Sequence, residues 1–349
     1  MAEVAIAVDV GGTSIKAGLL DTTGQLVHLQ RRPTRPDQGE RRQGAGNPDA
    51  DPIISTIIDT IDDLRATALA RGDTPVACGV VVPGVVDERL GVLAFAPNLG
   101  LRDVALRDAV AARVGLPTAL GHDVRAGALA EVRLGAGRGC DRTLFVALGT
   151  GIAAAMAIDG RIDPGAHGAS GEIGHVVIRL GADALPCGCG GRGCLERYAS
   201  ASAVAQAYAQ AVALADGPLF SRTDETAGVV GPSRVGAWPG RPSSVDAAEV
   251  VRRADAGEER AQAVWQEAVV ALADGLLIGI AVQDPRRIVL GGGLARAGRA
   301  LLEPLAKALA QRRTFHRLPE VVTAQLADEA GCYGAGLLAF DALAGGTRA

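Results

Sequence analysis

The chain has 349 residues, of which 48% are hydrophobic and 21% charged, and its formal net charge is −4. A chain of this length can bury a sizeable core, and the length suggests roughly two domains. The slight excess of acidic residues leaves no basic field to hold a phosphate backbone, which argues against nucleic acid as a partner. These properties indicate a globular protein that acts on small molecules.

The N-terminal residues, MAEVAIAVDVGG, have no basic segment before an apolar run and contain Glu3. They are therefore not expected to form a signal peptide. Because the sequence has no apolar run of about 18 residues free of Gly and charge, no membrane span or membrane partner is expected. The predicted location is the cytoplasm, where thiols stay reduced.

Short apolar runs rich in β-branched residues alternate with segments that have a helical period. Strands are predicted at 4–10, 76–82, 144–148, 175–179 and 287–290, and helices at 52–71, 106–113, 201–215 and 247–283. Strands that alternate with helices indicate an α/β fold with mostly parallel or mixed sheets. Two stretches interrupt this order, 31–51 and 216–244, and their Gly, Pro, Arg, Asp and Ser content predicts surface excursions.

Three glycine clusters follow predicted strands: DVGGT at 9–13, ALGTG at 147–151 and VLGGGLARAG at 289–298. Glycine-rich reversals let backbone N–H groups approach a phosphate closely. None of the three matches a P-loop or the dinucleotide fingerprint GxGxxG. Any one of them could be a plain turn, but three in this order favour nucleotide binding, and the first two suggest two similar lobes.

Three cysteines form a compact C-x-C-x4-C motif between glycines: Cys187, Cys189 and Cys194. Three thiolates can bind one Zn²⁺, and His175 is the nearest candidate for the fourth ligand of a tetrahedral structural site. The alternatives are a disulfide within the loop or three unliganded thiols, and a reducing location disfavours the disulfide. With four protein ligands no position remains for an activated water, so the predicted zinc is structural.

Two glutamates lie close to this motif in the sequence. Glu172 precedes His175 by three residues, and Glu196 follows Cys194 by two. A zinc ion bound by the loop would hold both carboxylates near each other, and paired carboxylates are good acceptors for the adjacent hydroxyls of a polyol.

Several strings together resemble the ROK family of repressors, open reading frames and sugar kinases, within the actin-like ATPase and hexokinase superfamily. They are VDVGGTSIKAGL at 8–19, GVVVPGVVD at 79–87, APNLG at 96–100, LGTGI at 148–152, GEIGH at 171–175, CGCGGRGCLE at 187–196, IVLGGG at 288–293 and DEAGCYGAGLLA at 328–339. The resemblance implies a two-lobed actin-like ATPase (ribonuclease H-like) α/β fold, with sugar and ATP in the cleft between the lobes. The small lobe would comprise 1–121 and about 333–349, and the large lobe 122–332 with the zinc loop 187–196.

The resemblance also implies roles for individual residues. Asp123 would be the general base that takes the proton of the sugar hydroxyl, although its local sequence would suit a helix cap equally well. The sugar would be bound by Asn98, His122, Asp123, Glu172, His175 and Glu196. The phosphates and Mg²⁺ would face Asp9, Gly11, Gly12 and Thr13, with Gly149, Thr150 and Gly151 contacting the phosphates from the other lobe and Gly291, Gly292 and Gly293 at the adenosine end.

Two positions depart from the family pattern. His122 stands where the family usually has Asn before the catalytic Asp, and Leu101 replaces the aromatic residue that often follows the NLG string in glucokinases. Because that Asn contacts sugar hydroxyls in the family, both changes weaken the expectation that the sugar is glucose.

The resulting hypothesis is an ATP-dependent hexose kinase that converts D-glucose to glucose 6-phosphate, and the alternative is a kinase of N-acetylglucosamine or N-acetylmannosamine. A sugar-responsive repressor is disfavoured because only eight residues precede Asp9, which leaves no room for a DNA-binding region. A sugar-binding protein without activity is disfavoured by Asp123, and polyphosphate as donor is not favoured by any dense basic stretch. The resemblance implies a homo-oligomer, either a dimer or a tetramer.

Overall fold

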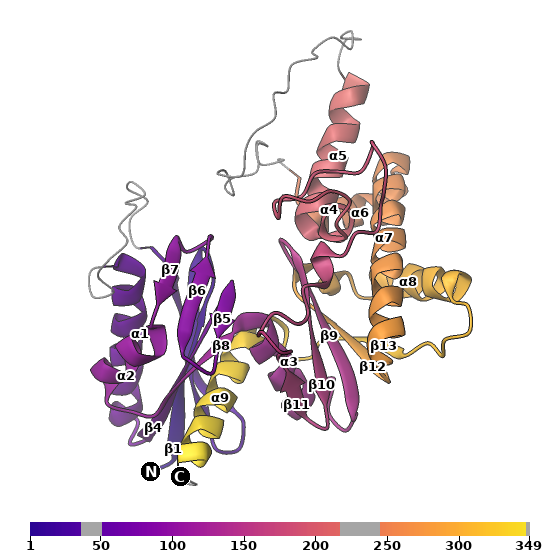
Figure 1. The fold of residues 1–349 in the computed structure, drawn as a ribbon. Coiled ribbons are helices and arrows are strands. Elements are labelled where there is room, and N and C mark those ends of the chain that lie inside the picture. The colour runs from indigo at the N-terminus through magenta and orange to yellow at the C-terminus, as the bar shows by residue number, and fades with distance from the viewer. Residues whose placement is uncertain (36–50, 217–244, 347–349) are drawn as a thin grey trace. The chain divides into compact units, whose positions relative to one another are not determined.

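The structure is a computed structural model that describes residues 1–35, 51–216 and 245–346 (Figure 1). Most of the predicted excursions at 31–51 and 216–244 lies outside the described residues, but residues 31–33 form the end of a strand, Leu26–Pro33, and not an excursion. The described chain forms two compact units. The first comprises 1–143, 155–170 and 325–349, and the second comprises 144–154 and 171–324.

The first unit contains a five-stranded sheet with the strand order β3-β2-β1-β4-β8. The strands are β1 (Glu3–Val10), β2 (Ser14–Asp21), β3 (Leu26–Pro33), β4 (Thr74–Val82) and β8 (Thr118–His122). β2 runs antiparallel to both β1 and β3, whereas β1, β4 and β8 are parallel. The sheet is therefore mixed, as the sequence predicted.

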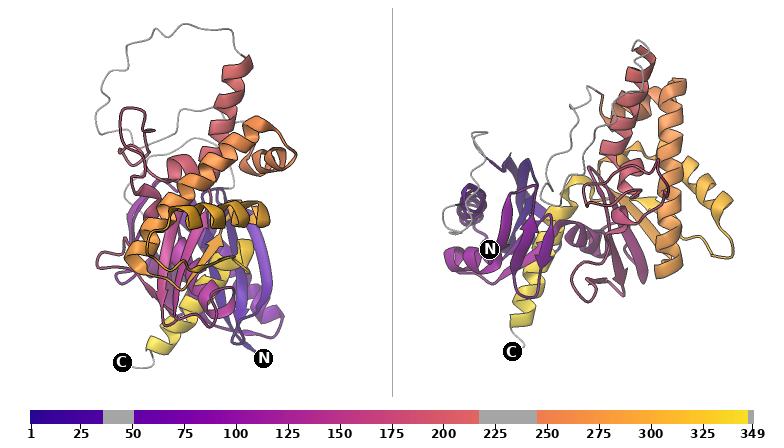
Figure 2. Two further views of the ribbon diagram at one scale, coloured as in Figure 1. Left: turned by 90° about the vertical axis from the view of Figure 1, so that its right-hand side faces the viewer. Right: turned by 45° about the horizontal axis from the view of Figure 1, so that its top comes forward.

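Side chains of different size occupy the two faces of β1 because successive residues of a strand point to opposite faces. Val4, Ile6 and Val8 pack in one core cluster with α1 (Pro52–Ala70) and α2 (Leu106–Val114). Ala5 and Ala7 lie on the other face, where α9 (Ala330–Gly346) packs (Figures 1 and 2). The small residues let α9 approach closely.

Two smaller parts complete the first unit. A three-stranded antiparallel sheet consists of β5 (Val85–Asp87), β6 (Val92–Ala96) and β7 (Leu101–Val104). Helix α3 (Asp123–Leu134) begins directly after β8 and packs against α9. Residue 98, a predicted sugar ligand, lies in the turn between β6 and β7.

A second five-stranded sheet has the order β11-β10-β9-β12-β13, and the boundary between the units falls within β9 and β10. The strands are β9 (Arg142–Leu148), β10 (Ile152–Ile158), β11 (Arg161–Asp163), β12 (Arg287–Gly291) and β13 (Glu320–Thr323). The helices of the second unit are α4 (Glu196–Ala199), α5 (Ala201–Asp216), α6 (Ala247–Asp255), α7 (Glu259–Gln283) and α8 (Arg299–Arg312). Most predicted strands and helices are thus confirmed.

Two predicted elements are wrong. Residues 175–179 do not form a strand: they follow a 3₁₀ turn at Ile173–His175, and only an isolated bridge joins Val177 to Cys194. The predicted helix 247–283 is two helices, because Gly257 between α6 and α7 has φ 92°, a left-handed conformation that ends a helix.

Helix α7 is long and apolar enough to cross a membrane by length and composition alone. However, 56% of its most apolar window is buried within the structure. Its buried residues pack against α4, α5, α6 and α8, so α7 is the core helix of the second unit.

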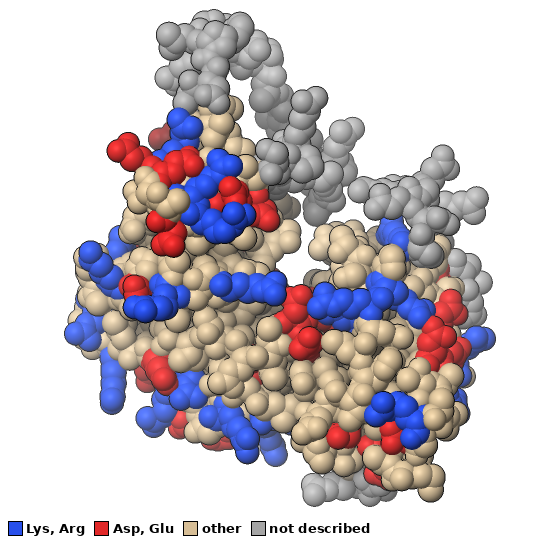
Figure 3. Space-filling model, turned by 180° about the vertical axis from the view of Figure 1, so that it is seen from behind, with Lys and Arg blue, Asp and Glu red and all other residues tan. Residues whose placement is uncertain are grey.

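The fold class is the one that the sequence predicted, the two-lobed actin-like ATPase fold. The predicted lobe boundary at residue 122 remains a prediction, and the contacts group α3 with the first unit. On the face of the molecule shown in Figure 3, basic and acidic side chains are interspersed.

Candidate active site

One group of candidate residues lies at the carboxyl edge of the first sheet. The parallel register pairs Asp9 with Val81 and Val82 with His122, so β1, β4 and β8 end at the same edge. In open α/β sheets ligands bind outside the carboxyl ends of the strands. The turn after β1 and the β8–α3 junction with Asp123 both lie there.

The turn after β1 is tight and lies beside Asn98. Gly11 donates its N–H to the carbonyl of Ser14 at 2.9 Å. A Cβ added to Gly12 would lie 3.6 Å from the Cβ of Asn98. The carbonyl of Thr13 accepts the N–H of Thr34 at 3.0 Å, which ties this turn to the end of β3. The structure therefore brings the first glycine turn and Asn98 together.

The carboxyl group of Asp9 has a perturbed pKa. Burial raises its pKa to about 6, and the ammonium of Lys16, 3.9 Å away, opposes that shift. Lys16 also donates to the carbonyl of Asp328 at 2.8 Å. A buried carboxylate gains from pairing with a cation, so Asp9 has the chemistry to hold Mg²⁺.

Asp123 is the first residue of α3, and the N-cap is His122. Nδ1 of His122 accepts the N–H of Val124 at 3.2 Å, and Oδ1 of Asp123 accepts the same N–H at 2.7 Å. Burial lowers the pKa of His122 to about 4, and Arg125 adds to the effect. The imidazole is thus neutral at pH 7, with its proton on Nε2.

The second and third glycine turns lie together in the second unit, where β9 and β12 are neighbours. Gly149 donates its N–H to the carbonyl of Gly151 at 3.0 Å, which closes a tight turn around Thr150. Gly292 has φ 82°, and a Cβ there would lie 2.5 Å from the carbonyl oxygen of Leu148. The second turn follows Leu148 directly, so the turn 149–151 and Gly292 lie close together.

The four predicted zinc ligands converge. The ligand atoms of His175, Cys187, Cys189 and Cys194 all lie within 4.8 Å of one another. Sγ of Cys189 is 3.7 Å from Sγ of Cys194, and Sγ of Cys187 is 3.6 Å from Nδ1 of His175. A tetrahedral Zn²⁺ with bonds of about 2.3 Å to sulfur and about 2.0–2.1 Å to nitrogen requires ~3.8 Å and ~3.6 Å.

The thiol of Cys187 needs a cation to be held as a thiolate. Burial raises the pKa of the Cys187 thiol, which donates to Oε1 of Glu196 at 3.1 Å. Metal ligation requires deprotonated sulfur, and a bound cation reverses such a shift. The donor set and its spacing fit Zn²⁺.

The two glutamates lie near different ring nitrogens of His175. Oε1 of Glu196 is 3.6 Å from Nδ1, and Oε2 of Glu172 is 4.0 Å from Nε2. A Cβ added to Gly151 would lie 3.0 Å from Oε2 of Glu196, so the second glycine turn borders this carboxylate. The second unit thus brings together the zinc ligands, both glutamates and the glycine turns.

Three residues near the first group, Glu88, Arg125 and Asp328, were not predicted to belong to the site. Glu88 hydrogen bonds to the backbone of His122 and to Arg125, and Asp328 approaches Lys16. Arg125 lies two residues after Asp123, a spacing that could have drawn attention to it. Glu88 and Asp328 come near their partners only through the fold.

A sequence model of the ROK family matches residues 5–342. The chain belongs to the ROK family. This family membership confirms the resemblance that the motifs indicated.

Relatives within the family extend over the whole chain. The glucokinase of Streptomyces coelicolor is 31% identical over 337 residues, which are 96% of each protein. The crystal structure of a ROK family glucokinase from Streptomyces griseus, in complex with glucose and AMPPNP, is 28% identical. It covers 97% of this chain and 99% of its own, with a TM-score of 0.75.

The family also contains regulators. The xylose repressor of Bacillus subtilis is 29% identical over 199 residues, which are 57% of this chain and 48% of the repressor. Sugar kinases and sugar-responsive repressors thus share this sequence pattern.

Proposed function

We propose that this protein is an ATP-dependent hexose kinase that phosphorylates D-glucose to glucose 6-phosphate. The observation that carries the proposal is the place of Asp123, at the sheet edge that also holds the first glycine turn and Asn98. Whole-length similarity to glucokinases supports it. We also propose a cytoplasmic homo-oligomer, which remains a prediction.

In the proposed reaction, the γ-phosphoryl group of ATP passes in line to a sugar hydroxyl. Such a transfer requires alignment, charge neutralisation and an acceptor for the hydroxyl proton. The carboxylate of Asp123 takes that proton. Its side chain is 34% exposed, which leaves it accessible to a substrate.

The sugar is held by neutral and acidic groups. Asn98 offers an amide, and the Nε2–H of neutral His122 offers a donor. Glu172 and Glu196 offer acceptors to adjacent hydroxyls, and both carboxylates lie near the ring of His175. The first two glycine turns, Gly11–Thr13 and Gly149–Gly151, would face the phosphates with backbone N–H groups other than those of Gly11 and Gly149, which are bonded within the turns, and Gly291–Gly293 would meet the adenosine.

Two metals belong to the proposal. Mg²⁺, bound with ATP, would neutralise charge on the phosphates, and Asp9 would hold it. Zn²⁺ would be held by His175, Cys187, Cys189 and Cys194 as a structural ion. The ligands of the zinc position Glu196 and Glu172 without supplying a group to the chemistry.

His122 favours a second candidate, a kinase of N-acetylglucosamine or N-acetylmannosamine. An imidazole Nε2–H is a donor only, whereas the family's Asn side chain offers both a donor and an acceptor. A donor at this position suits an acceptor on the sugar, and an acetamido carbonyl is one.

A panel of sugars tests the proposal. ADP release by purified protein is measured with glucose, mannose, fructose, N-acetylglucosamine and N-acetylmannosamine, with ATP and then polyphosphate as donor. We expect turnover with glucose and ATP. Turnover confined to an N-acetylhexosamine would establish the second candidate, and no turnover with any sugar would disprove both.

Asp123→Asn tests the base. The amide keeps the size of the side chain but cannot take the proton, so we expect kcat to fall by about 10²–10⁴-fold. Sugar affinity, measured by calorimetry, should change less than about threefold. A near-normal kcat in this variant would show that another group is the base.

A further inference from the structure

Glu88 lies just after β5, and one of its carboxylate oxygens holds two residues of the β8–α3 junction. Oε1 accepts the backbone N–H of His122 at 3.0 Å and the Nε–H of Arg125 at 2.8 Å. These two donors lie on either side of Asp123 in the sequence. A single carboxylate oxygen therefore fixes the chain immediately before and after the proposed base.

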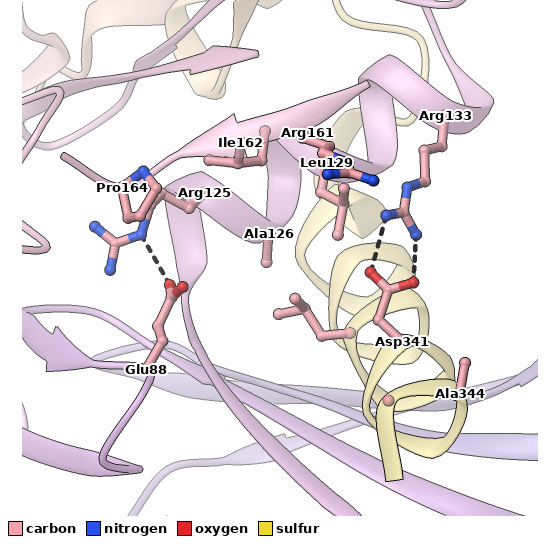
Figure 4. A pocket seen from close by; sticks show the side chains of 12 residues that line it. Glu88, Arg125, Ala126, Leu129, Arg133, Arg161, Ile162, Pro164, Asp341 and Ala344 are labelled. Atoms are coloured by element: carbon pink, nitrogen blue, oxygen red, sulfur yellow. Dashed lines mark hydrogen bonds and ion pairs between the residues drawn. The ribbon is translucent and has the colours of Figure 1, made fainter. Parts of the chain in front are cut away.

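Arg125 is buried, with 7% of its side chain exposed. Its Nη1 donates to the carbonyl of Gly168 at 2.9 Å. A buried guanidinium requires a counter-charge, which Glu88 provides. Figure 4 shows this pair at one end of a cavity of about 580 Å³ in the first unit.

The same cavity carries a second ion pair that serves as a comparison. Arg133 and Asp341 join α3 to α9 through two bonds of 2.9 and 2.8 Å (Figure 4). Arg133 lies ten residues beyond Asp123, near the far end of α3. The two pairs thus tie the same helix at opposite ends.

His122 is sensitive to this arrangement. Its Nδ1 caps α3 through Val124, and it lies 3.3 Å from Oδ1 of Asp123. The charged groups that face it are Asp123, Arg125 and the Glu88 carboxylate at its backbone. Burial and the charge of Arg125 keep the ring neutral, and the Val124 N–H at Nδ1 favours the tautomer with its proton on Nε2.

We propose that Glu88 and Arg125 are positioning residues, which hold Asp123 and His122 in the orientation that phosphoryl transfer requires. The inference rests on the proposed function. Neither residue contacts the substrate in this scheme. They act through the peptide of His122 and the first turn of α3, and a misplacement of about 1 Å at a base costs roughly 10²-fold in rate.

The test compares Glu88→Gln and Arg125→Lys with wild type and with Asp341→Asn as the matched control. Gln removes the charge that holds Arg125, and Lys keeps the charge of Arg125 but lacks the Nε–H. Each should lower kcat about 10–100-fold with sugar and ATP KM changed less than about threefold. Asp341→Asn removes an ion pair of the same helix and should leave kcat unchanged.

Two further readouts separate positioning from simple loss of stability. The double variant Glu88→Gln/Arg125→Gln should have a kcat no lower than that of the slower of its two single variants, because both substitutions disrupt the same ion pair. Removing the Arg125 charge should also let His122 protonate nearer its usual range. Arg125→Gln should therefore show an additional loss of kcat/KM between pH 6.5 and 4.

The outcomes are distinguishable. If wild type is active and Asp123→Asn is not, but Glu88→Gln and Arg125→Lys match wild type, the positioning role is wrong and the proposed function stands. The positioning role would also be wrong if Glu88→Gln and Arg125→Lys lowered kcat no more than Asp341→Asn does. It would be wrong as well if the losses of kcat in the two single variants added up in the double variant. If wild type phosphorylates no sugar, the proposed function fails and this inference fails with it.

Discussion

At the scale of single residues, His122 shows how burial selects a protonation state. The ring accepts a backbone N–H through Nδ1, which only the neutral form can do. Burial is the largest cause that lowers its pKa to about 4. The family's usual Asn at this position would cap α3 equally well and would have no charge to acquire.

We predict that His122→Asn reduces the sensitivity of the protein to acid. The folded state leaves His122 neutral until about pH 4, whereas the unfolded chain takes up a proton near pH 6.5. Stability is therefore full above pH 6.5 and falls as the pH drops toward 4. By linkage the loss is on the order of 2–3 kcal/mol, and the variant should lack it.

The measurement is the midpoint of urea unfolding at pH 7.5 and at pH 5. Wild type and His122→Asn should differ little at pH 7.5, and the variant should be the more stable at pH 5. His167→Asn is the control, since this histidine is exposed. Parallel pH profiles for wild type and His122→Asn would contradict the prediction.

At the scale of elements, the segment 171–196 is ordered by side chains and tight turns rather than by a ladder of strands. Gly193 has φ 79°, and a Cβ there would overlap the carbonyl oxygen of Arg179. Ile178 and Arg179 both donate backbone N–H groups to Gly193. The segment buries few large apolar side chains, so a metal ion bound by the Cys and His cluster would be the feature best able to hold it.

We predict that Cys189→Ser abolishes zinc binding. Cys189 is exposed, so the substitution disturbs no core packing. Elemental analysis should find about one Zn²⁺ per wild-type chain and almost none in the variant, with sugar affinity reduced at least about 10-fold. Cys140→Ser, outside the cluster, should keep the metal. A zinc-free protein with normal sugar affinity would show that the loop does not need a metal ion to keep its structure.

At the scale of the whole molecule, the C-terminal segment of the chain completes the unit that the N-terminal segment begins. The C-terminal helix α9 packs on β1, β4 and β8 and on α3, so the first unit is built from three separate segments of sequence. Glycines make this contact possible. A Cβ added to Gly79 would overlap the carbonyl oxygen of Ala335, and one added to Gly334 would overlap that of Ala126.

We predict that Gly334→Ala destabilises the protein and that Gly345→Ala does not. Both glycines lie in α9, but a Cβ at Gly345 would meet nothing within 4 Å. Overpacking against backbone costs about 1–3 kcal/mol, which lowers the thermal midpoint by several degrees, whereas Ala in an open helical position is favourable. Equal midpoints for the two variants would show that α9 packs less closely than described.

Much of the local structure could be predicted because it depends on local patterns. The apolar run at 4–10 forms β1, and the periodic isoleucines at 52–71 form α1. The convergence of the four candidate zinc ligands could be predicted because C-x-C-x4-C and a nearby His leave few geometries open. The predicted strand at 175–179 was wrong because its apolar residues have the pattern of a strand, whereas its backbone forms hydrogen bonds with Gly193 and Leu195 and not with any neighbouring strand of the described residues.

The sequence by itself determined the fold class, the family and the set of candidate ligands, since these depend on residue type and spacing along the chain. Only the tertiary structure decided which of these residues meet and which further residues join them. Asn98 lies beside Gly12, Glu196 lies beside Gly151, and Glu88 accepts hydrogen bonds from His122 and Arg125. Such contacts join residues tens of positions apart in the sequence, and they depend on how the whole chain packs. The structure also shows that His122 and Asp123 both accept the N–H of Val124 at the start of α3, so the proposed base takes part in the helix cap.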